Sequence, residues 1–160
     1  MSDPHRQSVP DHSWERLNPL QVGRYAEYLV KMEFTRLGFS VFGAEVDDRG
    51  IDMVVRTDAA QYFDVQVKSS RKLSYIFLSK DKFEIAKNVL AAIVIFFEGE
   101  PPRLFLIPST AWKNPDALLR DRDYGSGRKS KPEWGINVSR RNLPLLDRFA
   151  FEKIAQRHMT

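Results

Sequence analysis

The sequence contains no cysteine, which excludes disulfide bonds and thiolate metal sites. It also lacks a long hydrophobic run, because the most apolar stretch, residues 89–97, is too short to cross a bilayer. No glycine-rich phosphate loop is present: Gly125 and Gly127 stand in a polar segment without a following Gly-Lys pair. Residues 1–18 are polar and lack the apolar core of a signal peptide. We therefore expect a cytoplasmic protein with no membrane partner.

The composition is that of a folded protein with a mildly basic surface. Of the 160 residues, 42% are hydrophobic and 29% are charged, and the formal net charge is +4. This length and apolar content favour one globular domain and exclude a disordered chain. A small basic excess suits nucleic acid, but it also fits an ordinary solvated surface. We expect a flexible N-terminal arm over residues 1–18 and a single domain over residues 19–160.

Hydrophobic spacing predicts an α/β fold. A helix is expected over residues 19–37, between a capping Asn18 and a terminating Gly38. Three strands follow over residues 39–45, 51–57 and 62–70, and the short turn at 58–61 makes the last two a hairpin. Further expected elements are a helix over 79–90 capped by Ser79, strands over 91–97 and 103–108, one or two short helices in 109–121, a loop over 122–135 and a helix over 142–158. This order predicts a mixed central sheet of about five strands flanked by helices.

A polar stripe interrupts the apolar strands. Side chains alternate between the two faces of a strand, so Asp64, Gln66 and Lys68 share one face of the strand over 62–70. In the hairpin, Asp52 can lie beside Gln66 and Lys68. Carboxylate, amide and carbonyl oxygens suit Mg²⁺ or Mn²⁺, and a nearby ammonium can help to activate a water molecule. Together these groups can hydrolyse a phosphodiester.

The segments "GRYAEYLV", "GID" and "DVQVKSS" together resemble the PD-(D/E)XK nuclease superfamily, which includes restriction enzymes and archaeal Holliday-junction resolvases. The resemblance covers roughly residues 19–97 and implies a restriction endonuclease-like core of helix, three strands, helix and strand. It also implies a metal-dependent endonuclease that acts on DNA, uses Mg²⁺ or Mn²⁺ and assembles as a homodimer. The implied catalytic residues are Glu27, Asp52, Gln66 and Lys68, and the implied metal ligands are Glu27, Asp52, Gln66 and the carbonyl of Val67.

The sequence departs from the family pattern at Gln66, where the dyad normally has an acidic residue. A neutral amide oxygen binds Mg²⁺ more weakly than an ionised carboxylate. Small members that resemble this chain also carry a "QxK" dyad. Asp64 on the same face, Glu27 by a closer approach to the metal, or Asp47 and Asp48 before the second strand could supply the missing charge.

Two other readings remain open. The first is a catalytically inactive module of the same fold that binds nucleic acid or a protein. The second is a structural protein in which Asp52 or Asp64 pairs with Lys68 in a closed site. Taken singly, each residue also has an ordinary explanation, since an aspartate often caps a turn and a lysine protects an edge strand.

Several polar and basic residues are candidate contacts to a nucleic-acid backbone. They are Arg24 in the first helix, Ser69, Ser70, Arg71 and Lys72 after the polar stripe, and Arg128, Lys129 and Lys131 in the loop over 122–135. Such residues would hold phosphates without reading the base sequence. Each of them also fits a solvated loop or helix face.

Overall fold

The computed structural model describes residues 11–46 and 49–160. In this part of the chain the elements are α1 (Pro19–Arg36), β1 (Ser40–Gly43), β2 (Met53–Arg56), β3 (Tyr62–Ser70), β4 (Tyr75–Ser79), β5 (Val89–Ile95), β6 (Arg103–Pro108), the 3-10 helix η1 (Ser109–Lys113), β7 (Leu119–Arg122), β8 (Glu133–Asn137), the 3-10 helix η2 (Leu143–Phe149) and α2 (Phe151–His158).

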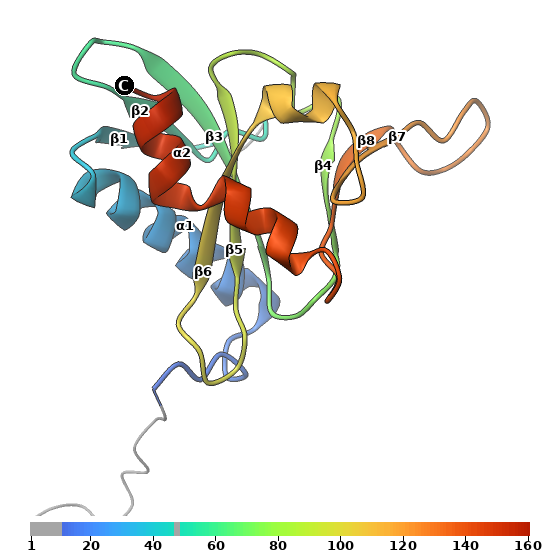
Figure 1. The fold of residues 1–160 in the computed structure, drawn as a ribbon, viewed down its shortest axis with the longest axis horizontal. Helices are drawn as coiled ribbons and strands as arrows, with labels where there is room; N and C mark the ends of the chain where they lie inside the picture. Colours follow the sequence, from blue (N-terminus) through green and yellow to red (C-terminus); the bar gives the residue numbers. More distant parts are fainter. Residues whose placement is uncertain (1–10, 47–48) are drawn as a thin grey trace, which may run out of the picture.

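The large sheet has the strand order β1-β2-β3-β5-β6 (Figure 1). β3 and β5 are parallel, whereas the other neighbouring pairs are antiparallel. The predicted mixed α/β fold with a five-stranded sheet is thereby confirmed. The predicted hairpin of β2 and β3 is confirmed as well, with a turn in which the Thr57 N–H donates to the Gln61 carbonyl (2.9 Å).

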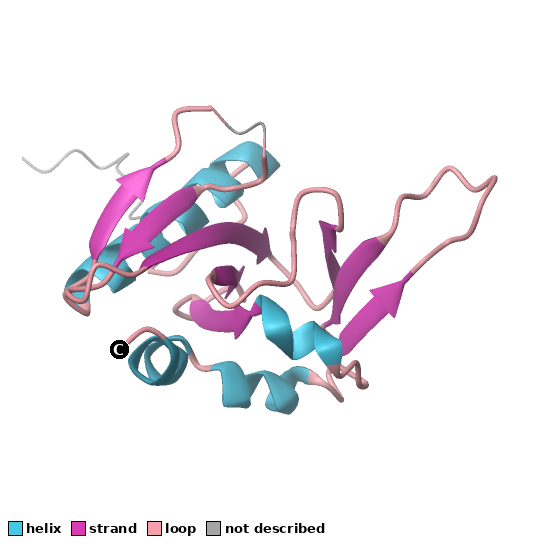
Figure 2. Cartoon of the chain, turned by 90° about the horizontal axis from the view of Figure 1, so that it is seen from above, coloured by secondary structure: helices cyan, strands magenta, loops and turns pink. Residues whose placement is uncertain are grey.

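A second sheet, with the order β4-β8-β7, was not predicted. It lies to one side of the large sheet, and its β7–β8 hairpin projects away from the rest of the fold (Figures 1 and 2). Two apolar cores result, and β5 contributes to both. Leu90, Ala92 and Val94 face the core that contains α1, and Ala91, Ile93 and Ile95 face the core that contains the small sheet.

Helix α1 begins and ends where the sequence predicts. Asn18 and Gln21 each accept the other's backbone N–H through the side chain (2.9 Å in both cases), and Pro19 occupies the first turn. Gly38 follows the last turn at φ +91°, a conformation that favours glycine. The buried side of the helix, formed by Val22, Ala26, Val30 and Phe34, packs on the large sheet.

The helix predicted over residues 79–90 does not form, so this prediction was wrong. Ser79 ends β4 and its hydroxyl binds the Asp81 carboxylate instead of capping a helix. The backbone that follows finds partners outside the segment. The Ser109 hydroxyl bonds both the N–H (2.9 Å) and the carbonyl (2.8 Å) of Ala86, and the Phe83 carbonyl accepts the Trp134 indole N–H (3.2 Å). Phe83 is buried in the core of the small sheet, so tertiary contacts outweigh the local helical pattern.

Two other segments differ from their predicted structure. The helix expected over 142–158 is split into η2 and α2 at Ala150, whose extended backbone (φ −49°, ψ 128°) forms a bridge with Phe105 of β6. The ends of the predicted loop over 122–135 belong to β7 and β8. The short helix predicted after residue 108 is present as η1.

The described part of the predicted N-terminal arm is docked on the domain. The Trp14 backbone N–H donates to the Glu98 carboxylate (2.9 Å), and its indole N–H donates to the Glu100 carbonyl (3.0 Å). The Trp14 ring also packs against Tyr25 and Phe96, with centroids 5.4 and 5.0 Å away. For residues 1–10, which lie outside the described residues, a flexible arm remains a prediction.

Gly135→Ala is expected to lower the free energy of unfolding by about 1–3 kcal/mol. The added methyl group would overlap the Tyr75 side chain, which would have to move, and such overpacking is destabilising. A Cβ atom at Gly135 would lie 1.9 Å from the Tyr75 hydroxyl and 2.3 Å from ring carbon Cζ. Urea unfolding measures the change. Gly23→Ala is the matched control: no atom lies within 4 Å of the added Cβ in α1, so that variant should be at least as stable as the wild type.

Candidate functional site

The start of β2 turns the Asp52 carboxylate toward the backbone of β3. Met53 is the register partner of Val65, and the Asp52 N–H also donates to the Val65 carbonyl (2.9 Å). Two residues therefore face one, which is the arrangement of a β-bulge and re-aims a side chain. The Val67 N–H donates to the Asp52 carboxylate (2.6 Å). Because the N–H and C=O of a strand residue point to the same edge, the Val67 carbonyl also faces this edge.

The predicted polar stripe of β3 is present. Phe63 and Val65 are buried in the core beneath α1, and Asp64, Gln66 and Lys68 are half-buried on the opposite face. Gln66 is paired in register with Ala91, a residue of the other core. The Gln66 side-chain oxygen Oε1 is buried, and no hydrogen-bond donor contacts it within the described residues. Such an oxygen needs a donor or a cation, because an unpaired buried acceptor carries a desolvation cost.

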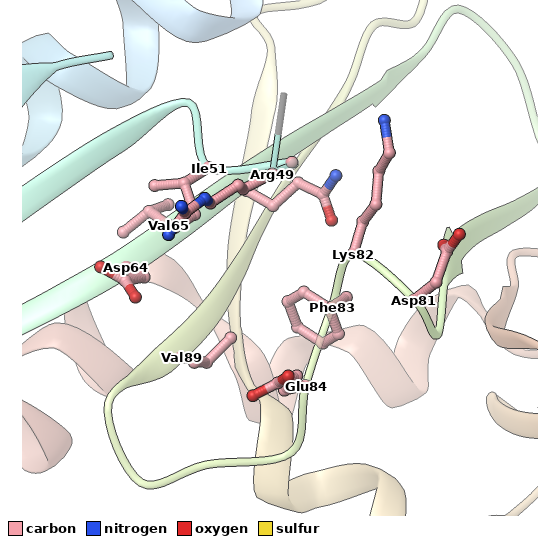
Figure 3. A pocket seen from close by; sticks show the side chains of 11 residues that line it. Arg49, Ile51, Asp64, Val65, Asp81, Lys82, Phe83, Glu84 and Val89 are labelled. Atoms are coloured by element: carbon pink, nitrogen blue, oxygen red, sulfur yellow. The ribbon is translucent and has the colours of Figure 1, made fainter. Parts of the chain in front are cut away.

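A cleft of about 480 Å³ opens over this face, between β3 and the segment 80–88. Figure 3 shows Asp64 on the β3 wall, Glu84 and Phe83 on the opposite wall, and Val89 between the two carboxylates. Burial raises the pKa of the Asp64 carboxyl. Gln66 lines the same cleft, so two members of the polar stripe share one solvent-accessible space.

The cleft includes residues that the sequence analysis did not assign to a site, namely Arg49, Asp81 and Glu84, together with Lys82. Figure 3 shows the Lys82 and Asp81 side chains at one end of the cleft. The sequence did not indicate a role for Asp81, Lys82 and Glu84, because residues 79–90 were predicted to form a helix. The packing of Phe83 and the hydrogen bonds from Ser109 and Trp134 bring this segment across the polar stripe.

Gly50 allows the chain to pass close to Gln66. Its φ of +73° favours glycine, and a Cβ atom there would lie 2.9 Å from the Gln66 amide nitrogen and 3.1 Å from the Lys82 carbonyl. The glycine of the "GID" segment therefore holds the Gln66 side chain and the segment after β4 in close approach.

Within the described residues, neither Glu27 nor Lys68 forms a side-chain hydrogen bond or ion pair with Asp52, Asp64 or Gln66. The Glu27 carboxylate accepts a hydrogen bond from Arg24 (2.9 Å) on α1, which covers the face of the sheet opposite to the polar stripe. Lys68 forms no ion pair with Asp52, Asp64 or any other described residue. The closed, salt-bridged core considered from the sequence is therefore not observed.

The candidate backbone-binding residues are dispersed. Arg24 pairs with Glu27, the Ser70 hydroxyl bonds the Lys72 carbonyl (2.7 Å), and Arg71 donates to the Leu17 carbonyl (2.5 Å). Ser69 is half-buried at the end of β3. By contrast, Arg128, Lys129 and Lys131 belong to the projecting β7–β8 loop (Figure 1), so the structure separates the predicted contacts into two regions.

Asp52, just before β2, and Gln66 and Val67 of β3 carry the kinds of oxygen that a hard divalent cation prefers. Asp52 supplies a carboxylate, Val67 a carbonyl at the same sheet edge, and Gln66 a buried oxygen that lacks a donor. Across residues 11–46 and 49–160, no group of three His, Asp or Glu side chains could hold a metal ion by itself. Asp47 and Asp48, which the sequence analysis also named, lie outside the described residues. A metal site here would therefore depend on amide and carbonyl oxygens as well as on Asp52.

No helix within the described residues is both long and apolar enough to span a membrane. No protein-family model matches the sequence, and no curated protein matches it.

Two solved structures are similar to this chain to different degrees. The first is Hjc from Archaeoglobus fulgidus, a Holliday junction resolvase from an archaeal hyperthermophile, with a TM-score of 0.52 and 18% identity over 84% of this chain and 95% of that chain. The second is the bacterial homing endonuclease I-Ssp6803I, with a TM-score of 0.42 and 19% identity over 69% of this chain and 79% of that chain. The second similarity is too low to support an argument. The chain thus has the restriction endonuclease-like fold that is seen in Hjc.

Proposed function

We propose that the protein is a divalent-metal-dependent endonuclease that hydrolyses DNA phosphodiester bonds. The observation that carries the proposal is the bulge at Asp52. It holds the Asp52 carboxylate against the backbone N–H of Val67, whose neighbours in the sequence are Gln66 and Lys68. The unpaired Gln66 oxygen supports it, because a bound cation would satisfy that oxygen. The similarity of the fold to a Holliday junction resolvase agrees with a DNA substrate.

In this proposal Asp52, Gln66 and the Val67 carbonyl would hold Mg²⁺ or Mn²⁺. Glu27 of α1 would have to leave its partner Arg24 to add a second carboxylate. The bound cation would polarise the phosphoryl group and lower the pKa of the attacking water. Lys68 is on the same face of β3 as Gln66. In this proposal its ammonium would help to activate the attacking water and would stabilise the negative charge that develops on the phosphate. A pair of copies would present two such sites to one DNA duplex or junction.

Cleavage of a mixed panel of plasmid, linear, branched and single-stranded DNA tests the proposal in the presence of Mg²⁺ or Mn²⁺. Lys68→Ala is expected to lower the cleavage rate by roughly a hundredfold or more, since loss of one charge-stabilising group has effects of that size. Lys113→Ala is the matched control, because Lys113 is an exposed lysine on η1 outside the cleft. Equal rates for the Lys68 and Lys113 variants would contradict the assigned role.

A catalytically inactive module of the same fold is the second candidate. The neutral Gln66 favours it, because the site lacks the negative charge of an acidic dyad residue. Thermal unfolding with and without Mg²⁺ or Mn²⁺ separates the two candidates. A functional metal site raises the melting temperature by mass action, whereas an inactive site does not.

A further inference from the structure

The inner face of the small sheet is buried in a hydrophobic core, whereas its outer face exposes an aromatic side chain. Ile76 and Leu78 of β4 point into the core, so Tyr75, Phe77 and Ser79 point outward. Phe77 is paired with Gly135 of β8, which has no side chain to cover it, and its exposed fraction is 54%. The Phe77 ring is therefore exposed to solvent on this face.

A partly open cavity of about 560 Å³ lies beside this face, lined by residues of β4, β7 and the β7–β8 loop. The aromatic residues Tyr75, Phe77 and Tyr124 line it. Three cationic side chains line the same cavity: Arg122 from β7, and Lys129 and Lys131 from the loop.

The only acidic residue that lines this cavity among those described is Glu133. Glu133 is 8% exposed, and its carboxylate accepts a hydrogen bond from the Tyr124 hydroxyl. Three cationic side chains therefore line the cavity against one largely buried carboxylate. This balance is complementary to an anionic ligand.

Existing contacts hold parts of this cavity in place. The Arg122 guanidinium stacks over the Tyr75 ring, 4.3 Å from its centroid, and Lys131 pairs with Asp81 (3.4 Å). Phe77 has no such ring partner within the described residues. A flat ligand group can therefore stack on Phe77 while its charged group meets Lys129 or Lys131.

The cavity is adjacent along the chain to the cleft beside Gln66. Ser79 lines the cavity, and Asp81 and Lys82 line the cleft. Between them, Lys80 is held by Asp121 (2.5 Å) and by the Trp134 ring (4.0 Å), so the segment 79–82 forms a fixed wall shared by both spaces. An extended polymer can pass from one space to the other across this wall.

We propose that the cavity between the outer face of the small sheet and the β7–β8 loop binds unpaired nucleotides of a single-stranded nucleic acid. A base stacks on Phe77, and Lys129, Lys131 and Arg122 contact the flanking phosphates. Single-strand binding proteins combine the same two elements, aromatic platforms and a basic groove. If the proposed nuclease function holds, its substrate contains an unpaired segment next to the cleavage site. The binding itself does not depend on that function.

Fluorescence anisotropy in EDTA tests this proposal without any cleavage. The probes are labelled oligothymidylate of about 12 nucleotides, which is within the usual size of single-strand sites, an abasic strand of equal length and a matched duplex. Phe77→Leu is expected to weaken binding of oligothymidylate by roughly fivefold to a hundredfold, because it removes a base–aromatic stack but stays apolar. Phe42→Leu is the control, since Phe42 is equally exposed (53%) but lies on β1, at the edge of the large sheet.

The abasic strand separates stacking from charge. The wild type should prefer oligothymidylate to the abasic strand, and Phe77→Leu should bind the two alike. Lys129→Gln should weaken both probes together and reduce the slope of log affinity against log salt by about 0.7, as loss of one phosphate contact predicts for a single strand.

Three outcomes would overturn the proposal: no preference for oligothymidylate over the abasic strand, equal losses for the Phe77 and Phe42 variants, or displacement by polyglutamate at the same charge concentration. Oligouridylate in place of oligothymidylate shows whether DNA or RNA binds more tightly. A protein that binds single strands in EDTA yet cleaves nothing with Mg²⁺ would refute the nuclease proposal alone. Cleavage without the Phe77 effect would refute the single-strand site alone.

Discussion

Asp52→Asn is expected to lower metal-dependent cleavage by roughly a thousandfold or more while the protein stays folded. The asparagine oxygen can still accept the Val67 N–H, so the bulge keeps its hydrogen bond. The negative charge, however, is lost. A bound metal contributes several kcal/mol of charge stabilisation to such reactions, and each 1.36 kcal/mol changes the rate tenfold.

Asp52→Ala separates the structural role of this residue from its chemical role. It removes both the charge and the hydrogen bond, so an unpaired Val67 N–H should cost about 1–3 kcal/mol of stability. Urea unfolding measures that cost, and calorimetric titration with Mn²⁺ measures metal binding. Asp58→Asn, in the exposed turn between β2 and β3, is the control. Wild-type cleavage by Asp52→Asn would show that Asp52 serves only the bulge.

Gln66→Glu is expected to have opposite effects with and without metal. The Gln66 oxygen is buried and lacks a donor, so an ionised carboxylate placed there without a cation is poorly solvated. The metal-free variant should therefore lose about 1–3 kcal/mol of stability at pH 7. A bound Mg²⁺ would neutralise the added charge, so affinity for the metal should rise by roughly tenfold or more.

Thermal unfolding across a range of Mg²⁺ concentrations measures both effects of Gln66→Glu. The variant should melt below the wild type in EDTA and gain more than the wild type as metal is added. Its deficit in EDTA should shrink near pH 4, because burial raises the pKa of a carboxyl and the protonated form carries no charge. Gln61→Glu, at an exposed position, is the control. Equal Mg²⁺ responses of the wild type and Gln66→Glu would argue that Gln66 does not contact a metal.

The sequence predicted correctly those parts of the fold that depend on residues close together in the chain. The capping pair of Asn18 and Gln21 and the positive φ of Gly38 set the ends of α1. Alternation along β3 separated its apolar face from Asp64 and Gln66, because successive side chains of a strand point to opposite faces. These features need only contacts within a turn or across a hairpin.

The small sheet was not predicted, because β7 and β8 lack the alternation of apolar and polar residues that is typical of a strand. β7 consists of Leu119 followed by charged residues, and β8 contains Gly135 in its centre. The β7–β8 hairpin joins a sheet only because β8 also pairs with β4, which is far away in the chain, as in the pair Tyr75 and Asn137. The cavity beside this sheet depends on that pairing, so the sequence indicated its basic residues but not the cavity itself.

The sequence by itself determined the α/β class, the first helix, the hairpin of β2 and β3, and the polar stripe, since all of these depend on periodicity and short-range contacts. The tertiary structure alone decided what faces the stripe. Ser109 and Trp134 bind the backbone of residues 83–86 and keep that segment from forming a helix, which places it across the cleft from Asp64. The buried, unpaired oxygen of Gln66 is a consequence of that packing, because burial and the absence of a donor are set by groups distant in sequence.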